Sequence, residues 1–261
     1  MKRRTISLLM SAAIVIALWY GLAIVVSATR GVSFPTPLST GVSLVGLLTG
    51  RILVGHSVYK HFLHSLTRWG VAFSIASVAG VAYGLAAGWR RTLEHVTLPI
   101  VHILQLIPGL AWIPVALLMF GIGQGATIFM IAVTAFSPIA INVVGGVRCV
   151  DTTYLRAARM MGARGRRILF SVLLPGALPQ ILSGLRTGLG NGWRVLVAAE
   201  MVVGTGTGLG YSIIQARWTL DYASAFSCVL LICLVGLLLE RLLFTRIERA
   251  TVERWGMSNA R

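Results

Sequence analysis

Long apolar runs without a charged side chain are the feature that most constrains the fold of this chain. Four runs, at residues 6–26, 69–87, 126–147 and 222–239, carry no charge, and a fifth, at 96–120, carries only His102. A helix needs roughly 20 apolar residues to cross the ~30 Å hydrocarbon core of a bilayer. Five transmembrane helices are therefore expected from these runs alone.

A sixth run, at residues 178–203, is hydrophobic but contains Arg186, Arg194 and Glu200. A charge at the centre of a bilayer costs roughly 2.5–3.5 kcal/mol on insertion scales, so each of these side chains needs a partner or a function. On one helix Arg194 and Glu200 lie about 120° apart, and Arg186 and Glu200 are about 21 Å apart along the axis. Each is therefore expected to face another helix, a second copy of the chain, or water.

The composition excludes several other classes of protein. Only 11% of the 261 residues are charged and 56% are hydrophobic, whereas soluble domains carry roughly 25% charged residues. The three cysteines form no CxxC pair, so neither a disulfide framework nor a cysteine metal site is expected. The only lysines, Lys2 and Lys60, are not in a P-loop, so this chain does not itself hydrolyse ATP. We expect no enzymatic activity, no cofactor and no metal.

The net charge of +16 comes from 23 Lys and Arg against 7 Asp and Glu. In a soluble protein this excess would suggest nucleic acid, but here the cations lie between the apolar runs and no nucleic-acid partner is expected. With a cytoplasmic amino terminus, sixteen cations fall on the inner side and five on the outer side, namely Arg30, Arg51, Lys60, Arg68 and Arg217. The positive-inside rule therefore predicts that both termini are cytoplasmic.

The segments that connect the apolar runs give weaker signals. The first run resembles a signal peptide, but its 21 residues exceed the usual 7–15, which favours an uncleaved helix. The loop at 27–66 is expected to be external, with a surface helix over residues 42–66 and solvated histidines at positions 56, 61 and 64. Gly80, Gly84 and Gly88 form a small-residue stripe suited to close helix packing. Pro108 and Pro114 should kink the third span, and residues 204–210 are expected to form a flexible outer turn.

The longest inner loop carries an amphipathic pattern. Leu155, Ala158 and Met161 recur at helical spacing while Arg156 and Arg159 face elsewhere. Glycine at position 162 permits a sharp turn before the basic stretch at 164–167. The pattern predicts two short helices that form a rigid protrusion; the alternative is a basic loop lying on anionic lipid.

The same loop resembles a known motif. Residues 156–175, RAARMMGARGRRILFSVLLP, are similar to the EAA loop of the permease subunits of ATP-binding-cassette (ABC) importers, in which two alanines, a glycine four residues on and a terminal leucine-proline hold fixed spacing. Arg156 stands where the motif has an acidic residue, so the ion pair of that acid is not implied here. The stretches 107–123, 184–193 and 197–211 resemble the nitrate, sulfonate and taurine class of these permeases.

The resemblance implies an all-α polytopic membrane protein with about six transmembrane helices and the MetI-like permease fold. Residues 1–66 would form the first helix and a periplasmic loop, 67–245 a five-helix core with the coupling loop at 148–175, and 246–261 a cytoplasmic tail. Implied partners are a second permease copy, two cytoplasmic ATPase subunits and an external solute-binding protein, in a bacterial inner membrane. The implied ATPase-coupling residues are Arg156, Ala157, Ala158, Gly162, Ala163, Arg166 and Pro175.

The implied activity is ATP-driven import of a small anion or zwitterion, such as nitrate, taurine or an alkanesulfonate, by alternating access. We expect Arg186 and Arg194 to line the passage and Glu200 to shape a gate or to pair across helices near the outer end. The alternative is that all three only tie helices together. Two rivals are an ion-coupled transporter or channel that uses Glu200, and a structural subunit that anchors a partner.

Overall fold

The computed structural model describes the backbone of residues 2–31 and 33–250, and nearly all of it is helical. The elements in chain order are α1 (Lys2–Arg30), α2 (Pro37–Leu48), β1 (Ile52–Leu53), β2 (His56–Ser57), α3 (Val58–Trp89), α4 (Arg91–Leu106), the 3-10 turn η1 (Gly109–Trp112), α5 (Ile113–Phe120), α6 (Gln124–Arg148), α7 (Thr152–Met160), α8 (Arg166–Ile168), the π-helical turn η2 (Leu169–Leu173), α9 (Leu174–Val203), α10 (Leu209–Trp218) and α11 (Tyr222–Ala250). Five helical segments are long and apolar enough to span a membrane, and a bent pair forms a possible sixth. The predicted all-α membrane architecture is confirmed.

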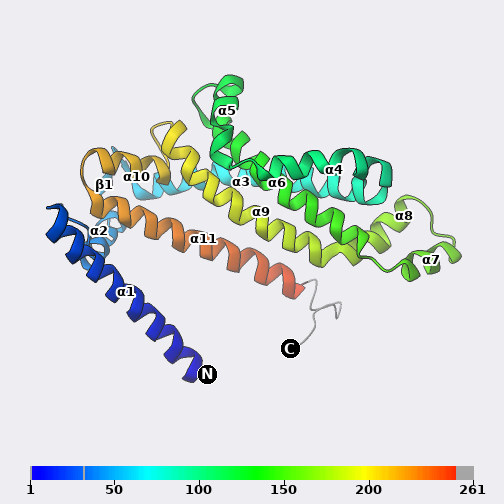
Figure 1. Cartoon of the computed structure of the whole chain (residues 1–261), viewed down its shortest axis with the longest axis horizontal. Coiled ribbons are helices and arrows are strands. Elements are labelled where there is room, and N and C mark those ends of the chain that lie inside the picture. Colours follow the sequence, from blue (N-terminus) through cyan, green and yellow to red (C-terminus); the bar gives the residue numbers. More distant parts are fainter. Residues whose placement is uncertain (1, 32, 251–261) are drawn as a thin grey trace.

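The core of the molecule is formed by α3, α6 and α9, which run side by side along its long axis (Figure 1). Helix α6 lies between the other two, and half of its most apolar stretch is buried. The predicted glycine stripe explains how closely α3 approaches α6: a Cβ on Gly84 would lie 2.4 Å from Cβ of Val143. Helix α9 meets α6 in the same way, because a Cβ on Gly188 would lie 2.7 Å from Cγ1 of Ile139. The same Ile139 side chain also fills the hollow at Gly80 of α3.

Replacing Gly84 by Ala should destabilise the protein by about 1–3 kcal/mol, because the new methyl group overlaps Val143 in a packed interface. Gly70→Ala is the matched control in the same helix, since no atom lies within 4 Å of a Cβ built there. The control should be neutral or slightly stabilising, as Ala favours helix over Gly. Unfolding of both purified variants measures the difference; equal stabilities would contradict this account of the α3–α6 contact.

The third predicted span is broken rather than gently kinked. Helices α4 and α5 meet at an angle of 103°, with Pro108 between them, and α5 projects from the side of the bundle (Figure 1). Pro108 cannot donate a backbone hydrogen bond, and Pro114 begins the new helix, where a missing donor costs little. The predicted position of the bend is confirmed, but the change of direction between the two helices is much larger than the expected kink.

The second span begins earlier than predicted. Helix α3 starts at Val58, with Ser57 as its N-cap, so residues 58–68 belong to a membrane helix and not to a loop. The boundary expected at residue 66 therefore falls inside α3. The expected surface helix over 42–66 was wrong: this stretch contains the end of α2, a two-stranded hairpin and the start of α3.

The remaining long helices pack less closely. Helix α11 lies along α9, whereas α1 diverges from the bundle and is near α2 and α11 only over its carboxyl-terminal half (Figure 1). In α1, Trp19 packs against Phe226 of α11, and its indole N–H donates to the carbonyl of Pro35 at 3.0 Å. Residues 251–261 of the expected cytoplasmic tail lie outside the described residues.

Candidate functional site

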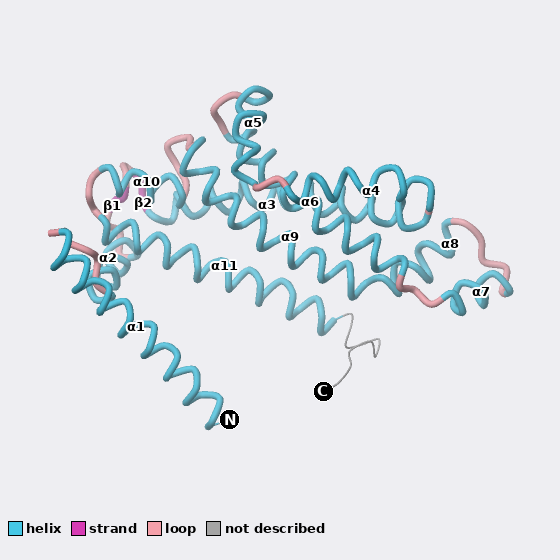
Figure 2. The backbone as a smooth tube through the Cα atoms, in the orientation of Figure 1, coloured by secondary structure: helices cyan, strands magenta, loops and turns pink. Residues whose placement is uncertain are grey.

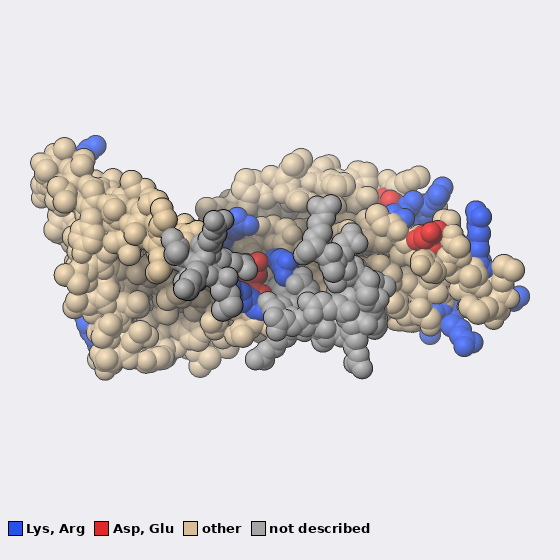
Figure 3. All heavy atoms as spheres, turned by 90° about the horizontal axis from the view of Figure 1, so that it is seen from below, with Lys and Arg blue, Asp and Glu red and all other residues tan. Residues whose placement is uncertain are grey.

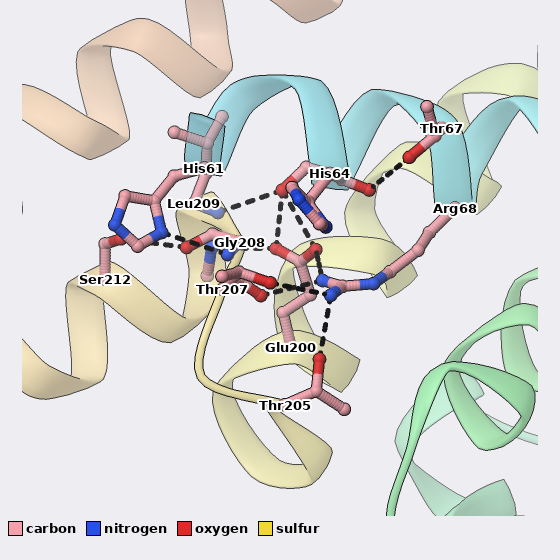
Figure 4. Close-up of polar contacts among 12 residues, drawn as sticks. His61, His64, Thr67, Arg68, Glu200, Thr205, Thr207, Gly208, Leu209 and Ser212 are labelled. Atoms are coloured by element: carbon pink, nitrogen blue, oxygen red, sulfur yellow. Dashed lines mark hydrogen bonds and ion pairs between the residues drawn. The ribbon is translucent and has the colours of Figure 1, made fainter. Parts of the chain in front are cut away.

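A buried ion pair joins α3 to α9 near the end of the bundle that carries the hairpin and α10. The Nη1 of Arg68 lies 2.7 Å from Oε1 of Glu200, and the two side chains are only 3% and 1% exposed (Figure 4). Both charges are thus removed from solvent within a single chain. Glu200 finds its partner on another helix, which is one of the arrangements expected for it.

The Glu200 carboxylate is also satisfied by uncharged donors. The hydroxyl of Ser65 lies 2.9 and 2.8 Å from its two oxygens, and the backbone N–H of Gly210 donates to Oε2 at 3.0 Å. Ser65 in turn accepts from the N–H of Leu209 at 2.9 Å. A buried carboxylate needs such compensation for the water it has lost.

Arg68 fixes the loop between α9 and α10. Its guanidinium donates to the hydroxyl and carbonyl of Thr207 and to the hydroxyl of Thr205, at 2.7–3.1 Å (Figure 4). Gly208 has a φ of +132°, and a Cβ there would lie 2.5 Å from the Glu200 carboxylate. The glycines therefore let the backbone approach the charge, and the expectation of a flexible outer turn was wrong.

His61 extends this cluster to the hairpin. Its Nδ1 accepts from the N–H of Gly208 at 3.1 Å (Figure 4). Its Nε2 lies 2.9 Å from the carbonyl of Leu53. The side chain is fully buried, so the expectation of a solvated histidine was wrong for this position. We call His61, Ser65, Arg68, Glu200 and the 204–208 loop the outer cluster. It joins the hairpin, α3, α9 and α10 at one point.

Sequence reasoning placed Arg68 in an outer loop and so missed the partner of Glu200. A signal was present: His61, Ser65 and Arg68 stand at i, i+4 and i+7, which lie on one face of a helix. The apolar run, however, begins only at residue 69, and the polar stripe before it resembles a loop.

The other two charged residues of α9 lie on its exposed side. Arg186 Nε is 3.9 Å from Oε1 of Glu240 on α11, and these side chains are 42% and 51% exposed. Arg194 hydrogen-bonds within its own helix, to the carbonyl of Gly190 at 3.1 Å and the amide oxygen of Asn191 at 2.6 Å. Figure 3, which views the molecule from below Figure 1, shows a small group of acidic and basic side chains near the middle of the visible surface.

The inner loop folds into the predicted protrusion at the far end of the bundle (Figure 1), but Met161, which was expected on the same face as Leu155 and Ala158, is exposed. Asp151 caps α7 by accepting from the N–H of Thr153 at 2.8 Å, and this hydrogen bond lowers the pKa of the Asp151 carboxyl. Ala158 is buried, and Leu155 packs towards the core formed by η2 and α9. Gly162 and Gly165 have φ values of +81° and +48°, so the turn between α7 and α8 uses glycine conformations.

The opposite face of the protrusion is solvent-exposed. Met160 and Met161 are 89% and 81% exposed, and Tyr154 is 67% exposed. All five arginines of this segment are exposed: Arg156, Arg159, Arg164, Arg166 and Arg167. The protrusion therefore presents apolar side chains surrounded by positive charge. It connects the end of α6 directly to the start of α9.

Comparison with known proteins identifies this architecture. Residues 76–251 match the family model described as the binding-protein-dependent transport system inner membrane component. The chain belongs to this family. A putative ABC transporter permease of Methanocaldococcus jannaschii is 38% identical over 190 residues, which is 73% of this chain and 71% of that protein. The taurine transport system permease of Escherichia coli is 32% identical over 228 residues, or 87% and 82% of the two chains. The bicarbonate transport system permease of Synechococcus elongatus is 37% identical over 195 residues, or 75% and 68%.

Solved structures agree with this membership. A solved structure of the methionine ABC transporter in an inward-facing conformation contains a chain that is 25% identical to this protein. The TM-score is 0.58, and the match covers 72% of this chain and 92% of that one. A chain of an amino acid ABC transporter, 18% identical, has the same fold, with a TM-score of 0.60 over 85% and 100%. The protein is thus a multi-pass inner-membrane permease, a transport subunit of an ABC importer, as the sequence motifs indicated.

Proposed function

We propose that two copies of this permease assemble with two cytoplasmic ATPase subunits and import a small anionic or zwitterionic solute that an external binding protein delivers. The observation that carries the proposal is the exposed protrusion of α7 and α8, built into the end of a bundle with the importer permease fold. Relatives named for taurine, bicarbonate and nitrate support the solute class. The positive-inside count supports cytoplasmic termini and a cytoplasmic protrusion.

In this proposal the protrusion is the contact with the ATPase. Tyr154, Met160 and Met161 supply apolar contact area, and Arg156, Arg166 and their neighbours supply charge. Ala157, Ala158 and Ala163 keep the turn compact, and Pro175 begins α9 directly behind it. ATP-driven movement of the partner would then pass through the protrusion to α6 and α9, and alternating access follows if the partner binds two states differently.

The face of α9 that carries Arg186 and Arg194 is proposed to line the passage. Half-exposed charges within a span would cost roughly 2.5–3.5 kcal/mol each against lipid, so this face fits a water-filled path better. Glu240 beside Arg186 offsets one positive charge, which leaves Arg194 as the stronger attraction for an anionic group. Glu200 is proposed to act at the outer end by holding the 204–208 loop through Arg68.

Arg194→Gln should lower uptake of an anionic solute by about tenfold or more in proteoliposomes that contain the complete transporter. A hydrogen bond to a charged group contributes roughly 1.5–3 kcal/mol, and about 1.4 kcal/mol corresponds to a factor of ten. Arg217→Gln is the control, because Arg217 lies over the ring of Trp218 at the outer surface. Unchanged uptake with unchanged ATP hydrolysis in the Arg194 variant would remove this residue from the passage.

The energy source separates the proposal from an ion-driven transporter. The acid that such a transporter would use, Glu200, is already engaged by Arg68, Ser65 and Gly210. Uptake should require ATP on the side of the membrane where the ATPase subunits lie and the binding protein on the opposite side. Uptake driven by a proton or sodium gradient without ATP would overturn the proposed function.

A further inference from the structure

Helix α2 has its polarity reversed relative to a helix on the surface of a soluble protein. Thr40, Ser43 and Leu47 face inward, at 0%, 5% and 0% exposure. The opposite face consists of Leu38, Val42 and Val45, which are 68%, 67% and 61% exposed. These three positions share one helix face by their i, i+4 and i+7 spacing.

The inward face is held by hydroxyl groups of α11. Ser43 Oγ lies 3.1 Å from Ser224 Oγ, and Ser227 donates to the carbonyl of Thr40 at 2.9 Å. Contacts between small hydroxyl residues are typical of helices packed together inside membranes. This side of α2 is thus occupied by α11, although the buried hydroxyl of Thr40 has no hydrogen-bond partner among the described residues, and the apolar side is directed away from α11.

The charge beside α2 belongs to an ion pair: Cδ of Arg51 would lie 3.7 Å from a Cβ built on Gly46, and Asp221, the partner of Arg51, accepts a hydrogen bond from Ser224. Within the sequence, however, no charged residue occurs between Arg30, where α1 ends, and Arg51, which follows α2. The ring of Phe226 packs on Trp19 and Phe34, with centroid separations of 5.8 and 5.3 Å. Of these three residues, Trp19 is of a type that is enriched at the boundary between lipid and water. Helix α2 is about 18 Å long, too short to span.

These observations distinguish between possible occupants of the exposed face. Water would leave three large aliphatic side chains unburied beside a buried polar face, which reverses the usual arrangement. The apolar surface of α1, on which Leu22 and Val25 are 53% and 57% exposed, also lies at this end of the molecule and belongs to a candidate span. We propose that α2 is embedded in the outer leaflet, with Leu38, Val42 and Val45 against lipid acyl chains. The inference does not depend on ATP-driven import.

Spin-label accessibility tests the proposal in the complete transporter, reconstituted in lipid nanodiscs. Cys149 and Cys233, which are exposed, are replaced by Ala, and the buried Cys228 is kept. A nitroxide is then attached to Val42→Cys, with Leu22→Cys on α1 as the lipid reference and Arg217→Cys, which lies on α10 outside the candidate spans, as the aqueous reference. All three positions are exposed, so the label should not disturb packing.

The Val42 label should be relaxed more strongly by oxygen, which concentrates in lipid, than by a water-soluble nickel chelate, as the Leu22 label should be. Stronger relaxation by the nickel chelate, as expected for the Arg217 label, would place α2 in water and overturn the proposal. Low accessibility to both reagents would show that protein covers this face, which would also overturn it. A photo-reactive phenylalanine at Val42 adds a second readout: crosslinking to phospholipid supports the proposal, and crosslinking to a permease copy or a binding protein contradicts it.

Discussion

Replacing Arg68 by Gln should reduce the free energy of unfolding of the permease by about 3–5 kcal/mol. The substitution leaves Glu200 buried without its ionic partner, and breaking one side of a buried ion pair typically costs this much. It also removes the hydrogen bonds that hold Thr205 and Thr207. Equilibrium unfolding of the purified permease in detergent, followed by circular dichroism, measures the loss.

Two comparisons make this result specific. Arg51→Gln is the matched control, because the Arg51–Asp221 pair is 51% and 32% exposed and should contribute at most about 1 kcal/mol. The double variant Arg68→Gln with Glu200→Gln removes both buried charges, so it should be less destabilised than the sum of the two single variants. If Arg68→Gln has as small an effect as Arg51→Gln, or if the two losses simply add, the buried pair is not the central element of the outer cluster.

Gly162→Pro should separate ATP hydrolysis from uptake while the permease still inserts and assembles. Proline fixes φ near −65°, whereas Gly162 has a φ of +81° and its N–H donates to the carbonyl of Arg159. The turn between α7 and α8 must therefore change shape. Loss of a coupling free energy of about 1–3 kcal/mol corresponds to roughly a 5–150-fold loss of uptake per ATP hydrolysed.

Gly162→Asn is the matched control for the proline variant. Asparagine tolerates the left-handed conformation better than other non-glycine residues, so this variant should retain most of the coupling. Uptake and phosphate release are measured together in proteoliposomes, and membrane insertion is checked by the yield of assembled complex. Normal coupling in the proline variant would refute the role of this turn.

Much of the fold follows from features that the sequence displays locally. Long runs without charge identify the long helices, because so many apolar residues in a row are typical of helices that span a membrane. The stripe of Gly80, Gly84 and Gly88 identifies one contact surface of α3. The start of α3 was missed because its first turns carry His61, Ser65 and Arg68, which hydropathy alone assigns to a loop. Their polarity is tolerated only because Glu200 and the 204–208 loop supply partners from distant parts of the chain.

In the candidate site, too, features with a local sequence signal were predictable, and contacts between distant residues were not. The protrusion was predictable because its amphipathic period and its glycines are local signals, and the structure shows both. The pairing of Glu200 with Arg68 joins positions 132 residues apart, and that of Arg186 with Glu240 joins two helices. Spacing along one helix identifies which charges need partners, but it does not identify the partners.

The position of Ile139 has a mechanical consequence. Its branched side chain fills hollows at Gly80 of α3 and Gly188 of α9, so neither helix can slide past α6 without first separating from it. We therefore expect these three helices to move together as one rigid lever. The protrusion joins α6 to α9 at one end of this lever, and the outer cluster clamps α3 to α9 at the other. In the proposed mechanism, a push on the protrusion would thus reach the outer cluster as rotation of a solid block rather than through successive local rearrangements.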